Sequence, residues 1–163
     1  MPTIVHNDFY VDILEPKQDP EESVRLASTV LAPLYQKCWQ EEQEPYYGKP
    51  FDLHAQLFLD LWFTGGSKIF LARRRGSDEA IGFLVGMLFR PIQYNAHVFQ
   101  VQDWYAGGRA DVEQELFDHV VSALRFIGCD EIWVGRSLKS APSLGSSWKK
   151  ANDFSITRYV KAE

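Results

Sequence analysis

Residues 97–134 read HVFQVQDWYAGGRADVEQELFDHVVSALRFIGCDEIWV, and this stretch decides the fold. It predicts a strand, a glycine-containing loop, an amphipathic helix and a second strand. The apolar residues of the helix recur at helical spacing from Val112 to Ile127, and Gly128 closes it. The helix start therefore lies beside a strand end, where many enzymes hold phosphate groups. Here that helix begins with acidic residues.

The sequence before this stretch predicts one strand and two helices. HNDFYVDILEP (6–16) alternates like a strand, and Asp19–Glu22 have the N-cap, first-turn proline and acids of a helix start. Pro33 should kink or shorten this helix, so EEQEPYYGKP (41–50) is interpreted as a connector. A second helix is expected from Phe51 to Phe63, ending at a glycine pair.

Three further β-rich runs and a tail complete the expected order of elements. KIFLARRR (68–75) and AIGFLVGMLF (80–89) predict an antiparallel hairpin, with its arginine cluster at the solvated end. After the strand EIWV, SSWKKA (146–151) is interpreted as a short helix. FSITRYVKAE (154–163) alternates like an edge or inserted strand.

Composition indicates one compact domain, residues 1–163, because 45% of the residues are hydrophobic and 14% aromatic. The net charge of -5 and the sequence pI of about 5.4 argue against a nucleic-acid partner, which needs a basic face. Cys38 and Cys129 lack metal-ligand spacing and predict buried free thiols, which fit a reducing compartment. We find no secretion signal and no apolar run of the ~18 residues that a membrane span needs, so we expect a soluble, cytoplasmic protein.

The predicted order of elements resembles that of the GNAT acyltransferase superfamily over nearly the whole chain. Two local matches support the resemblance: Val101-Gln-Asp-Trp-Tyr105 is similar to the family's strand-end V-x-P-x-Y, and the tail WKKANDFSITRYVK looks like its Y-E-K-L-G-F turn and last strand. The resemblance implies an α/β (α+β) fold with a mixed, mostly antiparallel central sheet flanked by helices. It also implies acetyl-CoA binding at a loop of the form Q/R-x-x-G-x-G/A.

The phosphate loop departs from the family pattern. Alignment by the helix places Gly108, Asp111 and Glu113 where the family has a basic or amide residue and two glycines. A like-charge pair at ~4 Å costs about 1 kcal/mol in water and about 4 kcal/mol at an intermediate dielectric, so these acids weaken phosphate binding. The alternative interpretation of Asp111 is structural: it is an ordinary N-cap residue of the helix. A rival alignment places the phosphate loop at Gly107, Gly108 and Arg109. In that alignment Arg109 is the one cation that can bind phosphate.

The catalytic residues that the resemblance implies are only partly present. The family uses a general base on or near the central strand and often a tyrosine acid, whose position here is taken by Trp148. Tyr105 or Tyr159 are possible substitutes. His97 and Asp103 bracket the central strand as candidate bases, and strict alternation places them on the same side about 20 Å apart.

The sequence favours a GNAT-like domain with a degenerate acyl-CoA site that serves as a structural or interaction protein. Tyr46 and Tyr47, aromatic residues in a charged segment, are the candidate interaction residues. Degenerate proteins of this size resemble those encoded by tailed bacteriophages, so we expect protein partners, as in a virion, with a homo-oligomer possible and no cofactor. The alternatives are an acetyl-CoA-dependent N-acetyltransferase with an atypical phosphate loop, and a domain that binds CoA or another nucleotide without turnover.

Overall fold

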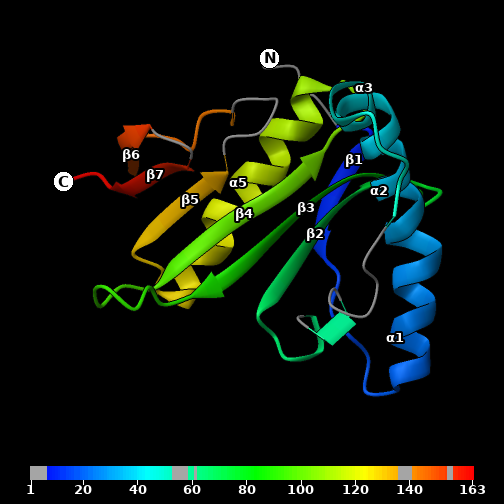
Figure 1. The fold of residues 1–163 in the computed structure, drawn as a ribbon, viewed down its shortest axis with the longest axis horizontal. Coiled ribbons are helices and arrows are strands. Elements are labelled where there is room, and N and C mark those ends of the chain that lie inside the picture. Colours follow the sequence, from blue (N-terminus) through cyan, green and yellow to red (C-terminus); the bar gives the residue numbers. More distant parts are fainter. Residues whose placement is uncertain (1–6, 53–58, 61, 136–140, 154–155) are drawn as a thin grey trace, which may run out of the picture.

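Seven strands form one mostly antiparallel sheet in the computed structural model, which describes residues 7–52, 59–60, 62–135, 141–153 and 156–163 (Figure 1). The strand order is β1-β2-β3-β4-β5-β7-β6. Every neighbouring pair is antiparallel except β4 and β5, which are parallel. The strands are β1 (Phe9–Ile13), β2 (Ser67–Arg74), β3 (Ala80–Phe89), β4 (Val98–Tyr105), β5 (Glu131–Gly135), β6 (Trp148–Asp153) and β7 (Ile156–Lys161). The predicted fold class, a mixed sheet flanked by helices, is confirmed.

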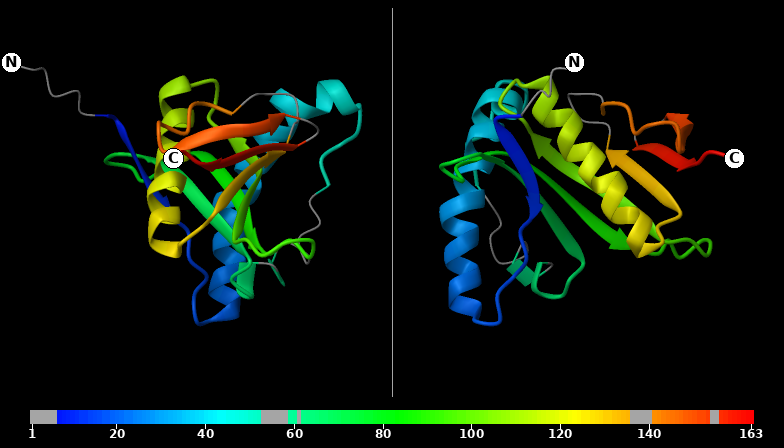
Figure 2. Two further views of the ribbon diagram at one scale, coloured as in Figure 1. Left: turned by 90° about the vertical axis from the view of Figure 1, so that its left-hand side faces the viewer. Right: turned by 180° about the vertical axis from the view of Figure 1, so that it is seen from behind.

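Helix α5 (Ala110–Ile127) is the crossover that the parallel pair β4–β5 requires. Its apolar face is buried as the sequence predicts, and Gly128 ends it in a left-handed conformation with φ 76°. Its start differs from the prediction: Arg109 is the N-cap residue, so Asp111 lies inside the first turn. Figure 2 shows α5 running obliquely across one face of the sheet.

The other face of the sheet carries one long helical rod from Pro20 to Tyr47 (Figure 1). Its segments follow one another without a break: α1 (Pro20–Leu26), η1 (Ala27–Leu31), α2 (Ala32–Cys38), η2 (Trp39–Gln43) and α3 (Glu44–Tyr47). Asp19 caps the start as predicted, with its Oδ1 accepting the Glu21 N–H at 3.0 Å. Gly48 ends the rod at φ 64°.

The interpretation of residues 41–50 as a connector is wrong for its first part, because the helix continues to Tyr47. Two wide π turns, η1 and η2, each end just before a segment whose second residue is proline, Pro33 or Pro45. A proline lacks the N–H for an ordinary helical bond and crowds the preceding turn. The wider turn accommodates both defects, so the prolines do not end the rod.

Two separate cores fill the two faces of the sheet. The core under α5 joins residues of that helix to inward residues of β1–β5, with Phe99, Trp104 and Phe117 among its largest members. The core under the long rod includes Leu31, Leu34, Trp62, Phe83 and Tyr105. The predicted burial of both cysteines as thiols is confirmed, since neither is in a disulfide and each is only 1% exposed.

The C-terminal segment corrects one prediction and confirms another. Residues 148–153 form strand β6 rather than the short helix expected at 146–151. Their strand conformation depends on pairing with β7, a partner that sequence periodicity does not reveal. β7 is the inserted strand, since it lies between β5 and β6. The predicted helix at 51–63 falls mostly outside the described residues.

Candidate functional site

Strand β4 carries a bulge close to its C-terminal end. Val85 of β3 pairs with Asp103, whereas the next residue, Gly86, pairs with Val101, so Gln102 is an extra residue in β4. Bulges of this kind bend a strand and re-aim its side chains. Val101 and Trp104, three residues apart, both point into the core under α5. Asp103 shares the opposite face with its partner Val85.

The bulge coincides with an opening between β4 and β5. Their pairing ends at Val101–Val134, while β4 continues to Tyr105. In the described part of the chain, β4 therefore has no strand neighbour on its β5 side from Gln102 onward.

Asp103 is held in a defined orientation at this opening. Its Oδ2 accepts a hydrogen bond of 3.0 Å from Nε2 of Gln43, in the η2 segment of the rod. Its Oδ1 accepts the Trp104 backbone N–H at 2.9 Å. These two hydrogen bonds hold the carboxylate in one orientation at the opening.

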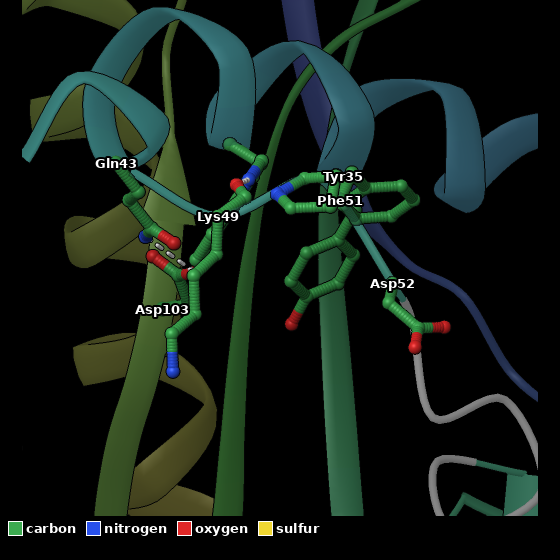
Figure 3. Close-up of a pocket in the computed structure, with 8 residues that line it drawn as sticks. Tyr35, Gln43, Lys49, Phe51, Asp52 and Asp103 are labelled. Atoms are coloured by element: carbon green, nitrogen blue, oxygen red, sulfur yellow. Dashed lines mark hydrogen bonds between the residues drawn. The ribbon is translucent and has the colours of Figure 1, made fainter. Parts of the chain in front are cut away.

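A pocket of about 370 Å³ opens beside Asp103. Figure 3 shows Asp103 and Gln43 at one side of this pocket and Asp52 at the other, with the rings of Tyr35 and Phe51 between them. The Trp39 ring is fixed by two contacts: its Nε1 donates to the Lys49 carbonyl at 2.7 Å, and it stacks on Tyr47 at 5.7 Å. We call this the Asp103 pocket, lined by Tyr35, Trp39, Gln43, Lys49, Pro50, Phe51, Asp52 and Asp103.

Tyr105 lies on the same face of β4 and is buried in the core under the rod. Its hydroxyl donates a 2.7 Å hydrogen bond to Oε2 of Glu41. Burial, reinforced by this carboxylate, raises the pKa of Tyr105 well above its usual range. Tyr105 is therefore a neutral phenol whose proton is directed at Glu41.

The structure separates the other catalytic candidates from Asp103. His97 is exposed, precedes β4 at its opposite end, and is bonded to Arg90 and Asp130. The expectation that His97 and Asp103 share a side fails, because the bulge turns Asp103 to the other face. Tyr159 of β7 packs against the core under α5. Trp148 is a strand residue of β6 in contact with that same core.

Gly107 and Gly108 form the turn between β4 and α5, with φ of 60° and 78°. Only glycine adopts this left-handed region readily, so the turn depends on both residues. A second pocket, of about 250 Å³, lies at this turn and is lined by Glu42, Ala106, Gly108, Arg109, Ala110 and Glu113. We call it the α5 pocket. It lies where the sequence places a phosphate loop, at the start of a helix of 18 residues.

The charges around the α5 pocket are paired within the protein. The Arg109 guanidinium binds Asp8 at 2.8 Å and Asp111 at 2.7 Å. These hydrogen bonds lower the pKa of both carboxyls below their usual range. Glu113 accepts a 3.0 Å hydrogen bond from Trp104 Nε1. The one basic residue of the loop is thus already neutralised by two acids.

Asp111 does not cap the helix as the sequence suggested. Arg109 occupies the N-cap position, and no side chain makes a capping bond there. Asp111 lies in the first turn, with its Oδ1 accepting the adjacent Val112 N–H at 3.0 Å. In this position Asp111 forms its ion pair with Arg109. The sequence alignment was anchored at the far end of the helix, so it did not define the residue at which the helix begins.

Tyr46 and Tyr47 lie on α3, at the end of the rod, and are 71% and 50% exposed. Their rings meet edge to face at 5.1 Å. Tyr47 also supports Trp39 and so contributes indirectly to the Asp103 pocket. The two residues are therefore available at the surface, while one of them also has a structural role.

Sequence reasoning missed Gln43 and Glu41 as site residues. Gln43 and Glu41 fell in the segment interpreted as a connector, so no helical face was assigned to them. A helix assumed to continue past Pro33 and Pro45 would have placed both residues on a helical face, and their polar side chains would then have been found. In the described part of the chain, no cluster of His, Cys, Asp and Glu could hold a metal ion. Within the same residues, no helix is long and apolar enough to cross a membrane.

Comparison with known proteins identifies the fold. No protein-family model matches the sequence, and no curated protein matches it. Among solved structures, a probable acetyltransferase has a TM-score of 0.58 at 21% identity, covering 80% of both chains. An aminoglycoside acetyltransferase from an uncultured soil metagenomic sample has a TM-score of 0.59 at 17% identity, covering 82% of both chains.

A third structure extends the similarity to almost the whole chain. The ribosomal-protein-S5-alanine acetyltransferase from Vibrio fischeri has a TM-score of 0.57 at 11% identity, covering 96% of this chain and 94% of that one. At such identities the comparison concerns the fold alone. Together with the bulged β4, the β4–β5 opening and the glycine turn before α5, it shows that this chain has the fold of the GNAT acetyltransferases.

Proposed function

We propose that this protein is an acyl-CoA-dependent N-acyltransferase with an atypical phosphate-binding loop. The observation that supports this most is the bulge at Gln102, which turns Asp103 toward a pocket at the opening between β4 and β5. A carboxylate held by Gln43 and Trp104 beside such a pocket is suited to general-base catalysis. The fold comparisons favour this function over a purely structural one.

The backbone around the α5 pocket fits a phosphate group better than its side chains do. Two glycines at positive φ lead into the start of a long helix, where N–H groups lack intrahelical partners. Gly107, Gly108 and Arg109 would therefore hold the phosphates mainly through backbone N–H groups. Glu42 and Glu113 in the same pocket, and the pairing of Arg109 with Asp8 and Asp111, lower the expected affinity.

Asp103 is the proposed base of the reaction. Acyl-CoA supplies an activated thioester: the acceptor nitrogen bonds to the acyl carbon as the carbon–sulfur bond breaks and the thiol leaves with one proton. Asp103 would take the proton that the neutral acceptor amine loses, and that proton would then pass to the departing sulfur, which leaves as the thiol. Gln43 keeps the Asp103 carboxylate in place. Tyr105 stays protonated at neutral pH and, through Glu41, stabilises the wall next to Asp103.

A second candidate function is a protein-interaction role without turnover. Its support is the exposure of Tyr46 and Tyr47 together with the neutralised Arg109. Exposed aromatic side chains in a polar surrounding are common in protein interfaces. A bacteriophage origin remains a prediction from the sequence.

Isothermal titration of the purified protein with acetyl-CoA tests the proposed function. Binding at micromolar strength, followed by thiol release in the presence of primary amines, is the expected result. Absence of acetyl-CoA binding would overturn the enzymatic proposal. The next experiment would then be a pull-down comparing the wild type with a Tyr46→Ser variant, which leaves the Trp39–Tyr47 stack intact.

A further inference from the structure

Another pocket, of about 290 Å³, lies at the C-terminal end of α5, where that helix meets the ends of β6 and β7. We call it the Arg125 pocket. Helix α5 has 18 residues and is therefore about 27 Å long, so this pocket is remote from the α5 pocket at the other end of the helix. A ligand here would be separate from the proposed acyl-CoA site. The lining includes Leu124, Arg125, Cys129, Ser147, Trp148 and Lys161.

Two of these residues are neighbours on the β6–β7 hairpin. Trp148 is the antiparallel partner of Lys161, and the Ala162 N–H next to this pair donates to the Ser147 carbonyl at 2.8 Å. Residues directly opposite each other in an antiparallel pair lie on the same face of the sheet. Trp148 packs against the core under α5, so Lys161 lies on the face that carries the helix. The cation of β7 and Arg125 of α5 therefore border one pocket.

The polar side chains of the Arg125 pocket are donors without acceptors. Elsewhere in the protein, four indole N–H groups each donate to a protein acceptor, those of Trp39, Trp62, Trp104 and Trp133. The indole N–H of Trp148 has no such acceptor among the described residues. The side chains of Arg125 and Lys161 likewise make no hydrogen bond or ion pair with any residue in the described part of the chain. Three donors from three elements therefore lack an acceptor around one pocket.

The charges around the Arg125 pocket favour an anion, although the protein as a whole has a net charge of -5. No described lining residue carries a carboxylate, whereas two carry a full positive charge. Asp130 and Glu163 follow lining residues in the sequence but do not line the pocket, and the Asp130 carboxylate accepts the His97 N–H at 2.8 Å. The C-terminal end of α5 contributes a partial charge of only about -0.5. The local charge is therefore positive.

A phosphate monoester matches these donors better than a carboxylate does. At neutral pH it carries a charge of about -1.5 to -2 and three acceptor oxygens, whereas a carboxylate carries one charge and two oxygens. The guanidinium of an arginine also binds phosphate through two parallel hydrogen bonds. The pocket volume of about 290 Å³ is close to the lower limit of about 300 Å³ for small-molecule sites, so the ligand must be small.

We propose that the Arg125 pocket binds a small organic phosphate monoester, with the phosphate group between Arg125 and Lys161 and the indole N–H of Trp148 as a further donor. The organic part lies against the apolar portion of the lining, which includes Leu124 and Ala162. This inference is independent of the proposed function, because it requires neither Asp103 nor acyl-CoA.

Calorimetry with four probes tests the ligand class on the wild-type protein. The probes are phenyl phosphate, benzoate, phenol and inorganic phosphate, titrated at about pH 7.5, above the second phosphate pKa of about 6. We expect phenyl phosphate to bind at least about tenfold more tightly than each of the other three. Equal binding of benzoate or phenol would overturn the assignment of a phosphate group. Equal binding of inorganic phosphate would overturn the assignment of an organic ligand.

Single variants locate the bound probe. Arg125→Gln and Lys161→Gln should each weaken phenyl phosphate binding about tenfold, because each removes one charge-assisted hydrogen bond. Trp148→Phe keeps an aromatic ring without the N–H and should weaken binding about fivefold. Arg25→Gln is the matched control, since it removes the same charge from an exposed arginine of α1. A thermal melt of each variant checks that it is folded.

The comparison with the control and with acetyl-CoA decides the outcome. Loss of binding in Arg125→Gln and Lys161→Gln, with wild-type affinity in Arg25→Gln, would support the assigned site. An equal loss in Arg25→Gln would show a general charge effect and overturn it. Phenyl phosphate should bind equally well in the presence of acetyl-CoA. Competition between the two would place the probe in the α5 pocket and also overturn the inference, whereas failure of acetyl-CoA to bind would concern the proposed function alone.

Discussion

The two pockets near the C-terminal end of β4 differ in how their charges are used. In the Asp103 pocket, two neutral N–H donors orient a carboxylate beside aromatic rings. In the α5 pocket, the single arginine is bound by two carboxylates, and one further acid accepts an indole N–H. The first arrangement places an oriented carboxylate in the wall of a pocket. The second leaves the backbone as the main phosphate-binding element.

The largest effect is expected from Asp103→Asn, which tests whether the Asp103 pocket contains the base. Loss of a general base lowers rates by about 10²–10⁴-fold, so kcat should fall by that factor while acetyl-CoA affinity stays unchanged. Thiol release and calorimetry measure the two quantities, with Asp118→Asn, on the exposed side of α5, as the control. If Asp103→Asn keeps the wild-type kcat, the general base is another residue. The Asp103 pocket would then no longer differ from the α5 pocket by containing the base.

The second prediction concerns the charges of the α5 pocket. The double variant Asp111→Asn/Glu113→Gln removes two negative charges and frees Arg109 from one of its partners. Affinity for acetyl-CoA should rise by at least about 30-fold, since two like charges at ~4 Å together cost about 2 kcal/mol in water and more at a lower dielectric. Calorimetry measures the change, and Asp118→Asn again serves as control. Unchanged affinity would show that these acids do not limit cofactor binding.

The third prediction concerns the bulged strand that lies between the pockets. A Cβ at Gly86 would overlap the Phe99 ring and approach the Gln100 carbonyl oxygen at 2.9 Å. Gly86→Ala should therefore destabilise the protein by about 1–3 kcal/mol. Chemical unfolding measures this value. Gly135→Ala is the matched control, because among the described residues its Cβ meets the Val101 carbonyl oxygen alone, at 3.9 Å. Similar stability of both variants would mean that the strands around the bulge accommodate the added Cβ at little cost.

The smallest effect is expected from Asp8→Asn, which removes one partner of Arg109. Arg109 lowers the pKa of Asp8 below the usual value of 3.8, so the carboxylate stabilises the fold above that pH. This contribution disappears as the pH falls through the lowered pKa. The melting temperature of wild type should exceed that of Asp8→Asn slightly at pH 6, and the difference should vanish well below about pH 4. A difference that persists in strong acid would argue against the ion pair.

Much of the fold could be predicted because its signals are local. The apolar periodicity of 112–127, the N-cap at Asp19 and the β-rich runs of the hairpin each depend on neighbouring residues. The errors at 41–50 and 146–151 have a different origin. Pro33 and Pro45 usually interrupt a helix, and only packing of the whole rod on the sheet favours the wide turns that accommodate them. Strand β6 likewise depends on β7.

The candidate site could be predicted only as a set of residues. The sequence identified Asp103, Tyr105 and the glycine turn, yet it placed Asp103 on the wrong face and did not connect it with Gln43. Hydrogen bonds between residues 60 positions apart depend on how the rod crosses the sheet. The pairing of Arg109 with Asp8 joins residues 101 positions apart and is equally invisible in the sequence.

The sequence by itself therefore determined the order of most elements, the α5 crossover and the acidic character of its start, because periodicity, capping and charge are properties of neighbouring residues. Only the tertiary structure decided the face on which Asp103 lies, the aromatic wall next to it and the neutralisation of Arg109. A bulge is defined by two paired strands, and a pocket by elements that meet in space. Neither the bulge nor the pocket exists until segments distant in the sequence have packed together.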